Sequence, residues 1–330
     1  MRYRTIGQDP RNRREVSVLS LGAMLLGSAT DEETSFAILD RYVEAGGTFV
    51  DTANVYAYWV TGSQGGESER LLARWIRSRG IGDEITVATK LGARPKDPGT
   101  GYLDNAEGLG AKTVREAAER SREQLGLEKL PLLYAHIADP ATPLEETVDA
   151  FAGLVAEGVV GLLGISNHWT WQVARAREYA RAAGLPGYEV AQYHHTYFRR
   201  AADLPTRPSL EDHEGTVGGD MLSYLRADPT MSLVAYTPLL AGAYSRTDKP
   251  LGAEYDHPGT ALRRAALAEV ARETGATVNQ VVLSWLIDAD VPAIPLVGAS
   301  SVAQLEESLE AVELRLTGEQ RARLDGSGEE

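Results

Sequence analysis

Thr48-Phe-Val-Asp51 is the first of three stretches that decide the fold; the others are Ile85-Thr-Val-Ala-Thr-Lys90 and Leu132-Leu-Tyr-Ala-His136. Each is a short apolar run, typical of a buried β-strand, that ends on a polar side chain. In a parallel β/α barrel the carboxyl ends of all strands meet on one rim, where the chemistry is found. We therefore expect the three polar ends to share a proton-transfer site with Tyr56, which follows the first run.

Short β-branched runs alternate with longer segments of helical period along the whole chain, as in repeated β/α units. A hairpin of the first residues is expected to precede the first strand. Eight such units predict a closed (β/α)8 TIM barrel, because an open doubly wound sheet usually has fewer strands. The expected strands span residues 16–21, 48–51, 84–90, 131–136, 159–165, 188–193, 231–237 and 292–297. The expected helices span 32–45, 67–79, 113–125, 144–157, 170–183, 218–227, 260–274 and 277–288, with a last one from 302.

Three of these helices begin with the pattern of a capping box, in which a serine or threonine precedes Glu or Gln by three residues. The pairs are Thr113 with Glu116, Thr142 with Glu145, and Ser301 with Gln304. The last pair predicts a helix amino-terminus that could hold an anion.

No change of composition divides the chain, so we expect residues 1–330 to form one barrel domain. Three segments, 52–66, 91–112 and 198–217, follow strands and are longer than ordinary connections. Long loops on the rim usually shape substrate pockets or lids. Disordered decoration is the alternative interpretation of each segment.

The formal charge of −14 and the pI near 5.0 argue against a nucleic-acid or anionic-membrane partner. The chain has no cysteine, which excludes disulfides, thiolate catalysis and zinc–sulfur sites. No apolar run has transmembrane length, and the start lacks a signal core. We expect a cytoplasmic protein, monomeric or homo-oligomeric, and the preference for Arg over Lys suggests a GC-rich bacterium.

Tyr56 is the candidate acid of the site. A free phenol has a pKa near 10, so it can donate a proton at neutral pH only if its anion is stabilised. The ammonium of Lys90 supplies that stabilisation, and Asp51 holds the ammonium charged and aimed. His136 can orient a carbonyl or an alcohol by hydrogen bonding. Each residue alone has a structural interpretation (rim aromatic, strand-end lysine, helix cap, core histidine), but their joint placement favours chemistry.

The segments that carry these residues resemble those of the aldo-keto reductases over nearly the whole chain. The matching segments are Asp51-Thr-Ala-Asn-Val-Tyr56 with Gly66-Glu-Ser-Glu69, Ala88-Thr-Lys90, Leu133-Tyr-Ala-His136, and Gly164-Ile-Ser166-Asn167 with Gln192. The resemblance implies a TIM barrel, an extended nicotinamide cofactor on the rim, and hydride transfer to a carbonyl. It makes Tyr56 the proton donor, Lys90 and Asp51 its tuners, and His136 the substrate orienter.

The resemblance also implies which residues contact the cofactor. Ser166, Asn167 and Gln192 would bind the carboxamide, and Tyr236 would stack on the nicotinamide. The backbone near Thr237, Leu239 and Gly242 would meet the pyrophosphate. The full implied set is Gly22, Met24, Asp51, Ser166, Asn167, Gln192, Tyr236, Thr237, Pro238, Leu239, Gly242, Gly298, Ser300, Gln304, Glu307 and Ser308.

Departures from the family pattern bear on the cofactor. Many relatives carry Arg or Lys where Ser300 stands and Asn where Ser308 stands. A basic residue there grips the 2′-phosphate of NADP, and serine cannot supply that charge. NADP(H) is the family default, and NAD(H) is an equal alternative. A second departure is Ala57, where the family commonly has Gly, followed by an insertion over residues 58–65.

Tyr58, Trp59, His136 and Trp169 are the candidate substrate-binding residues, and such aromatics would suit a sugar or polyol face. No metal is expected, because His194 and His195 are strand neighbours and face opposite sides; one of them should face the rim with Tyr197. The expected ligand is a small carbonyl compound or its alcohol. The rival hypotheses are a nicotinamide-sensing regulatory subunit on the same barrel and a barrel isomerase or lyase.

Overall fold

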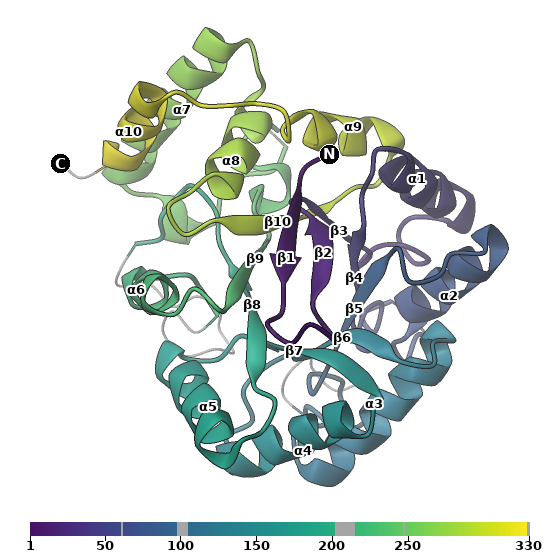
Figure 1. The fold of residues 1–330 in the computed structure, drawn as a ribbon. Helices are drawn as coiled ribbons and strands as arrows, with labels where there is room; N and C mark the ends of the chain where they lie inside the picture. Colours follow the sequence, from purple (N-terminus) through teal and green to yellow (C-terminus); the bar gives the residue numbers. More distant parts are fainter. Residues whose placement is uncertain (61, 98–104, 202–214, 247, 329–330) are drawn as a thin grey trace.

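Eight parallel strands close into a barrel in the order β10-β3-β4-β5-β6-β7-β8-β9, which confirms the predicted TIM barrel (Figure 1). This computed structural model describes residues 1–60, 62–97, 105–201, 215–246 and 248–328. The barrel strands are β3 (Ser20–Gly22), β4 (Phe49–Asp51), β5 (Thr86–Leu91), β6 (Leu130–Ala135), β7 (Val160–Ser166), β8 (Tyr188–His194), β9 (Ser232–Tyr236) and β10 (Ala293–Gly298).

Helices surround the barrel, and most of them join one strand to the next (Figure 1). They are α1 (Glu32–Glu44), α2 (Glu67–Arg79), α3 (Ala111–Leu125), α4 (Leu144–Ala156), α5 (Thr170–Ala183), α6 (Gly219–Ala227), α7 (Pro258–Thr274), α8 (Val278–Ile287), α9 (Val302–Glu310) and α10 (Gly318–Gly326). Two 3-10 turns, η1 (Leu240–Gly242) and η2 (Ala253–Tyr255), lie between β9 and α7. The last helix, α10, was not predicted.

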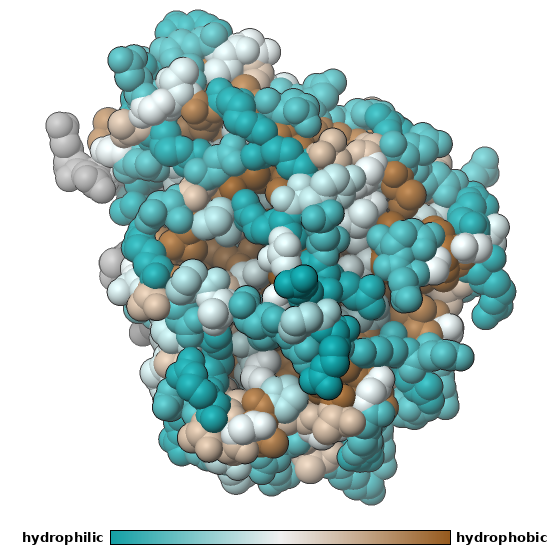
Figure 2. All heavy atoms as spheres, in the orientation of Figure 1, coloured by the Kyte–Doolittle hydropathy of each residue, from teal (hydrophilic) through white to brown (hydrophobic). Residues whose placement is uncertain are grey.

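A hairpin of β1 (Tyr3–Ile6) and β2 (Arg14–Ser17) crosses the amino-terminal end of the barrel (Figure 1). Ile6 and Val16 are fully buried and pack with Phe49 and Leu132 in the interior of the barrel. The hairpin therefore closes the core at this end, and its outer face carries mostly hydrophilic residues (Figure 2).

The prediction of one strand over residues 16–21 is wrong, because the chain turns between Ser17 and Ser20. Ser17 ends the hairpin and Ser20 begins the barrel, and the two strands belong to different sheets. The hydroxyl of Ser17 donates to the carbonyl of Leu19 at 2.8 Å and stabilises the turn between them. A mostly apolar run, interrupted only by Ser17 and Ser20, thus contains a change of sheet.

Two of the three expected capping boxes are also wrong. Helix α3 begins at Ala111 rather than at Thr113, and its first N–H donates to the Glu146 carboxylate at 3.0 Å. Pro143 caps α4, while the Thr142 hydroxyl donates instead to Asp139 at 2.7 Å. In α3 a carboxylate from α4 takes the place of the local cap, whereas in α4 the Thr142 hydroxyl binds Asp139 and no side chain caps the helix.

The third box is half formed. Ser301 caps α9 by accepting from the Gln304 N–H at 3.3 Å. The Gln304 side chain accepts from the Ser300 N–H at 2.8 Å instead of from Ser301.

At the carboxyl rim, the register of the strands aligns four residues in a row. Gly298 pairs with Gly22, Gly22 with Asp51, and Asp51 with Ala88. Parts of the expected rim loops, residues 98–104 and 202–214, lie outside the described residues. None of the helices in the described part of the chain has the length and apolar character that a bilayer crossing requires.

Candidate active site

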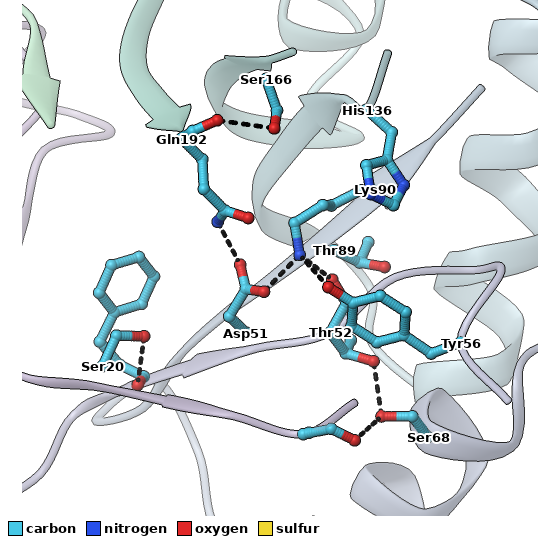
Figure 3. A network of polar contacts seen from close by, with 12 residues as sticks. Ser20, Asp51, Thr52, Tyr56, Ser68, Thr89, Lys90, His136, Ser166 and Gln192 are labelled. Atoms are coloured by element: carbon cyan, nitrogen blue, oxygen red, sulfur yellow. Dashed lines mark hydrogen bonds and ion pairs between the residues drawn. The ribbon is translucent and has the colours of Figure 1, made fainter. Parts of the chain in front are cut away.

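Lys90 is the centre of a buried polar network at the ends of β4 and β5 (Figure 3). Its side chain is 1% exposed, and its ammonium forms an ion pair with Asp51. The same nitrogen donates to the Thr52 carbonyl at 2.8 Å and to the Tyr56 hydroxyl at 3.0 Å. The structure therefore places Tyr56 next to Lys90, as expected. An ammonium at this distance stabilises the phenolate form by charge attraction and hydrogen bonding.

The segment after β4 reaches Lys90 because it continues alongside β5. The N–H of Thr52 donates to the Ala88 carbonyl at 2.8 Å, and the N–H of Asn54 donates to the Lys90 carbonyl at 3.0 Å. The next turn brings the Tyr56 hydroxyl back over the strand. Backbone pairing between the extension of β4 and strand β5 thus fixes the distance between the Tyr56 hydroxyl and the Lys90 ammonium.

Asp51 is fully buried and held from two sides. Its second oxygen accepts from the Gln192 amide at 2.8 Å, so β8 also contacts the network (Figure 3). Burial raises the pKa of Asp51, and the Lys90 ammonium and the Gln192 amide act in the opposite direction. The donors compensate a carboxylate that would otherwise be costly to desolvate.

His136 lies beside Tyr56 at the end of β6. The two rings are 6.2 Å apart between centroids and nearly perpendicular, and the backbone N–H of His136 donates to the Leu91 carbonyl at 2.9 Å. The structure therefore brings Asp51, Tyr56, Lys90 and His136 together. Trp59, 49% exposed, also packs on Tyr56, with ring centroids 6.2 Å apart.

Two carboxylates, the buried Glu69 and the partly buried Glu107, support this corner. The sequence alone predicts no role for Glu107, and Glu69 appears there only in a segment that resembles the family. Glu69 accepts from the Thr89 hydroxyl at 2.6 Å, directly behind Lys90, and burial raises its pKa from 4.5 to about 7. Glu107 accepts from the Asn54 amide at 2.7 Å, from the Gly92 N–H at 2.9 Å and from Arg120 at 2.8 Å. These links join distant segments, so no local spacing announces them.

Four of the expected cofactor residues, Ser166, Asn167, Gln192 and Tyr236, form a polar cluster at the ends of β7, β8 and β9. The Ser166 hydroxyl donates to the Gln192 carbonyl at 2.7 Å. The Asn167 amide donates to the His136 carbonyl at 2.9 Å, and its oxygen accepts from the Tyr236 hydroxyl at 2.7 Å. His194 packs edge-on against Tyr236, with ring centroids 5.6 Å apart.

Strained backbone concentrates at the same rim. The non-glycine residues with left-handed φ in the described chain are Ala57, Asn167, Thr237, Leu240 and Ala241, and all follow the carboxyl ends of strands. Such conformations cost about 1–2 kcal/mol each for residues other than glycine and cluster at functional sites. The segment 237–242, expected near a pyrophosphate, contains three of them.

The junction between β10 and α9 is open and polar. Gly298, Ser300 and Gln304 are exposed. Ser300 donates through its N–H and its hydroxyl to Gln304, at 2.8 and 3.0 Å. Ser308 is buried and donates to the Gln304 carbonyl at 3.4 Å.

Glu307 lies one turn further along α9 and is held by the start of α8. It accepts from the Thr277 hydroxyl at 2.7 Å and from the Asn279 amide at 3.3 Å. The same amide also donates to Ser245 at 3.3 Å, so this point joins the segment after β9 to α8 and α9.

The remaining expected residues lie at or after the carboxyl ends of barrel strands. Gly22 ends β3, Met24 after it is 44% exposed, and Trp169 caps α5. The hydroxyl of Tyr58 donates to the Asp97 carbonyl at 2.9 Å. The segment Thr237-Pro238-Leu239 leads into η1 and Gly242.

His194 and His195 face opposite sides, as expected. The expectation that Tyr197 accompanies the rim-facing histidine is wrong. His195 and Tyr197 both pack on Trp285, on the helix side, whereas His194 contacts Tyr236. Burial lowers the pKa of His195 to about 4. Within the described residues, no group of three or more His, Asp or Glu side chains could hold a metal ion.

A parallel barrel whose rim holds a tyrosine over a buried lysine–carboxylate pair defines a (β/α)8-barrel enzyme built for proton transfer. Comparison with known proteins gives this class a family. Residues 18–329 match the family model described as "Aldo/keto reductase family". The chain belongs to the aldo-keto reductase family and is an NAD(P)-dependent oxidoreductase.

Similar curated proteins come from fungi and from a bacterium. The norsolorinic acid reductase stcV of Emericella nidulans is 31% identical over 323 residues, covering 92% of this chain and 76% of that protein. The uncharacterized oxidoreductase YrpG of Bacillus subtilis is 29% identical, with 97% and 93% covered. An aryl-alcohol dehydrogenase of Pestalotiopsis microspora is 29% identical, with 92% and 77% covered.

Proposed function

We propose that the protein interconverts an aldehyde or ketone and its alcohol, with Tyr56 donating or accepting the proton. The observation that carries this proposal is the 3.0 Å contact between the Lys90 ammonium and the Tyr56 hydroxyl. In carbonyl reduction Tyr56 gives its proton to the developing alkoxide, and Lys90 holds the resulting phenolate. In alcohol oxidation the phenolate takes the proton back. His136 orients the reacting oxygen from beside Tyr56.

The residues on the rim fit a nicotinamide dinucleotide. When bound, the nicotinamide supplies or accepts the hydride. Ser166, Asn167 and Gln192 present side-chain amide and hydroxyl groups at one end, and Tyr236 offers an aromatic face beside them. Further along, the left-handed backbone of 237–242 leads to the polar junction of β10 and α9. This succession of amides, ring, strained backbone and helix amino-terminus supports an extended cofactor.

The choice between NADP(H) and NAD(H) depends on the junction. Ser300 contributes only a hydroxyl and an N–H, and both already bind Gln304. Glu307, one turn further on, adds a negative charge. A 2′-phosphate therefore meets serines and a helix amino-terminus but no guanidinium from position 300. These features favour NAD(H) for this chain against the NADP(H) default of the family.

We propose a small, at least partly aromatic or apolar substrate. Trp59 and Met24 are large hydrophobic residues left exposed on the rim, and Trp59 packs on Tyr56. The aromatic compounds in the names of two relatives, norsolorinic acid and aryl alcohols, would pack against such apolar residues. A sugar or polyol would instead need polar groups, which Trp169 and His136 would have to supply. A cytoplasmic location remains our expectation.

Two measurements test the proposal. Fluorescence titration with NADH and NADPH should give saturable binding of both, with the smaller dissociation constant for NADH. Absorbance of the reduced nicotinamide should then fall when aldehydes, including benzaldehyde, are added. Binding without any turnover across the aldehyde panel would instead indicate a cofactor-sensing subunit. Absence of cofactor binding would indicate an isomerase or lyase.

A further inference from the structure

A cavity of about 320 Å³ lies beside the catalytic turn, outside the cofactor residues. Its walls come from the segments after β4 and β5 and from the first turns of α3. Tyr58, Arg94, Lys96, Thr113 and Arg120 are among its lining residues. This volume is at the lower end of small-molecule pockets and has room for a compact polar group. None of the expected catalytic or cofactor residues lines it.

Positive charge dominates the cavity once ion pairs are assigned. Arg120 donates to Glu107 at 2.8 Å, and Glu107 also accepts from the Asn54 amide and the Gly92 N–H. This carboxylate is therefore fully engaged, and its charge is offset by Arg120. Glu116, a second acidic residue on the wall, is largely exposed and lies 3.8 Å from Lys112.

Arg94 and Lys96 are different, because neither forms an ion pair within the described part of the chain. The Arg94 Nε donates to the Gln64 carbonyl at 3.1 Å, which fixes the guanidinium while its terminal nitrogens make no hydrogen bond to described residues. Lys96 binds Asn105 only through its backbone N–H at 2.8 Å. Both side chains line the same cavity, in a protein whose formal charge is −14.

We propose that this cavity binds an anionic group, a carboxylate or a phosphate, through Arg94 and Lys96. A guanidinium donates to two oxygens of such a group at once, and an ammonium adds a mobile point charge. Thr113 places the first turn of α3, a helix of 15 residues, on the same wall, and a helix amino-terminus favours negative charge. The anion comes either from the substrate or from free solution. The substrate case rests on the proposed function.

Binding is tested first without turnover. Inorganic phosphate and acetate are titrated into the protein by calorimetry or by NMR of the backbone amides. We expect saturable binding that shifts the amide resonances of Arg94 and Lys96, and a roughly tenfold weaker affinity in Arg94→Gln and in Lys96→Gln. Arg272→Gln, an exposed position on α7, removes the same charge and should bind as the wild type does. Equal affinities in all four proteins, or none, would overturn the proposal.

Kinetics then identify the source of the anion. Benzaldehyde and 4-carboxybenzaldehyde are compared as a neutral and a charged substrate in wild type, Lys96→Gln and Lys96→Glu. If the substrate carries the anion, the ratio of kcat/KM for charged over neutral aldehyde should fall about tenfold in the first variant and further in the second. If the anion is free, phosphate should change the rate with benzaldehyde in the wild type only. Phosphate binding with no turnover of either aldehyde would refute the proposed function and leave the anion site standing.

Discussion

The ends of β4 and β5 and the junction of β10 with α9 are parts of one rim, yet they are built in opposite ways. In the first region Asp51 and Lys90 are completely buried, and each makes its hydrogen bonds inside the protein. In the second region Ser300 and Gln304 are exposed and bind each other. Substituting one partner of a buried ion pair costs much stability, whereas substituting an exposed serine costs little. The proposed function therefore places the chemistry at the region fixed by buried charges and the cofactor choice at the region that tolerates exchange.

The strongest test of this contrast is Lys90→Met. The variant removes the ammonium from Tyr56 and leaves Asp51 as a buried carboxylate without its ion partner. We expect turnover to vanish and the free energy of unfolding to fall by roughly 3–5 kcal/mol. Urea denaturation and steady-state rates measure the two effects. In the double variant Asp51→Asn/Lys90→Met stability should partly return while turnover does not. A single variant as stable as the wild type would show that the corner is not held by charge.

Tyr56→Phe removes only the hydroxyl, so the fold should be unaffected. We expect kcat to fall roughly 10²–10⁴-fold, the usual contribution of a proton donor. The dissociation constant of the cofactor, measured by fluorescence quenching, should stay within error of the wild-type value. A variant that keeps more than a few per cent of the rate would remove Tyr56 from the mechanism. Tyr3→Phe is the matched control, because Tyr3 lies in the hairpin at the opposite end of the barrel and its hydroxyl donates to the Gly46 carbonyl.

The stability of a Glu69 variant measures the free-energy cost of burying a carboxylate in the first region. Burial raises its pKa from 4.5 to about 7, so the folded protein holds this proton more tightly than the unfolded chain does. Stability contributed by this group is full below about pH 4.5 and is lost as the pH rises towards 7. Glu69→Gln should therefore unfold with a free energy up to about 3 kcal/mol larger than the wild type at pH 8. At pH 5 the gain should nearly vanish. A gain that is the same at both pH values would contradict the assignment.

Ser300→Arg tests the adjustable end. A guanidinium there should bind a 2′-phosphate and tighten NADPH relative to NADH by roughly tenfold. The two dissociation constants, each measured at low and high salt, give the ratio. Ala303→Arg places the same charge on an exposed position of α9 and should shift the ratio much less. If both variants act alike, the effect is general electrostatics rather than a phosphate contact.

The smallest expected effect concerns Ala57, which is buried and has a φ of 72°. Ala57→Gly relieves a left-handed conformation but loses a buried methyl group, so stability should change by less than about 1 kcal/mol. Ala53→Gly is the matched control, because Ala53 is equally buried without a positive φ. Thermal unfolding should show the control to be about 1–2 kcal/mol less stable than Ala57→Gly. Equal losses would mean that Ala57 pays no conformational penalty.

The barrel and the proximity of Asp51, Tyr56, Lys90 and His136 could be predicted because their signals are local. Apolar runs of strand length predict the eight β/α units. Polar residues at the ends of those runs predict where the carboxyl rim lies. The turn between Ser17 and Ser20 was missed because an apolar run does not show where the chain changes sheets. Glu107 was missed because its partners, Asn54, Gly92 and Arg120, lie on separate segments. Contacts between distant segments leave no periodic mark in a sequence.

The hairpin at the amino-terminal end also constrains how the protein is made. Arg2 donates to Asp288, 286 positions away, at 2.8 Å, and the barrel closes only when β3 pairs with β10. Pairings this far apart in sequence form slowly. The barrel of a nascent chain can therefore close only after nearly the whole chain has been synthesised. Until then, the unpaired edges of its sheet need protection from pairing with other chains.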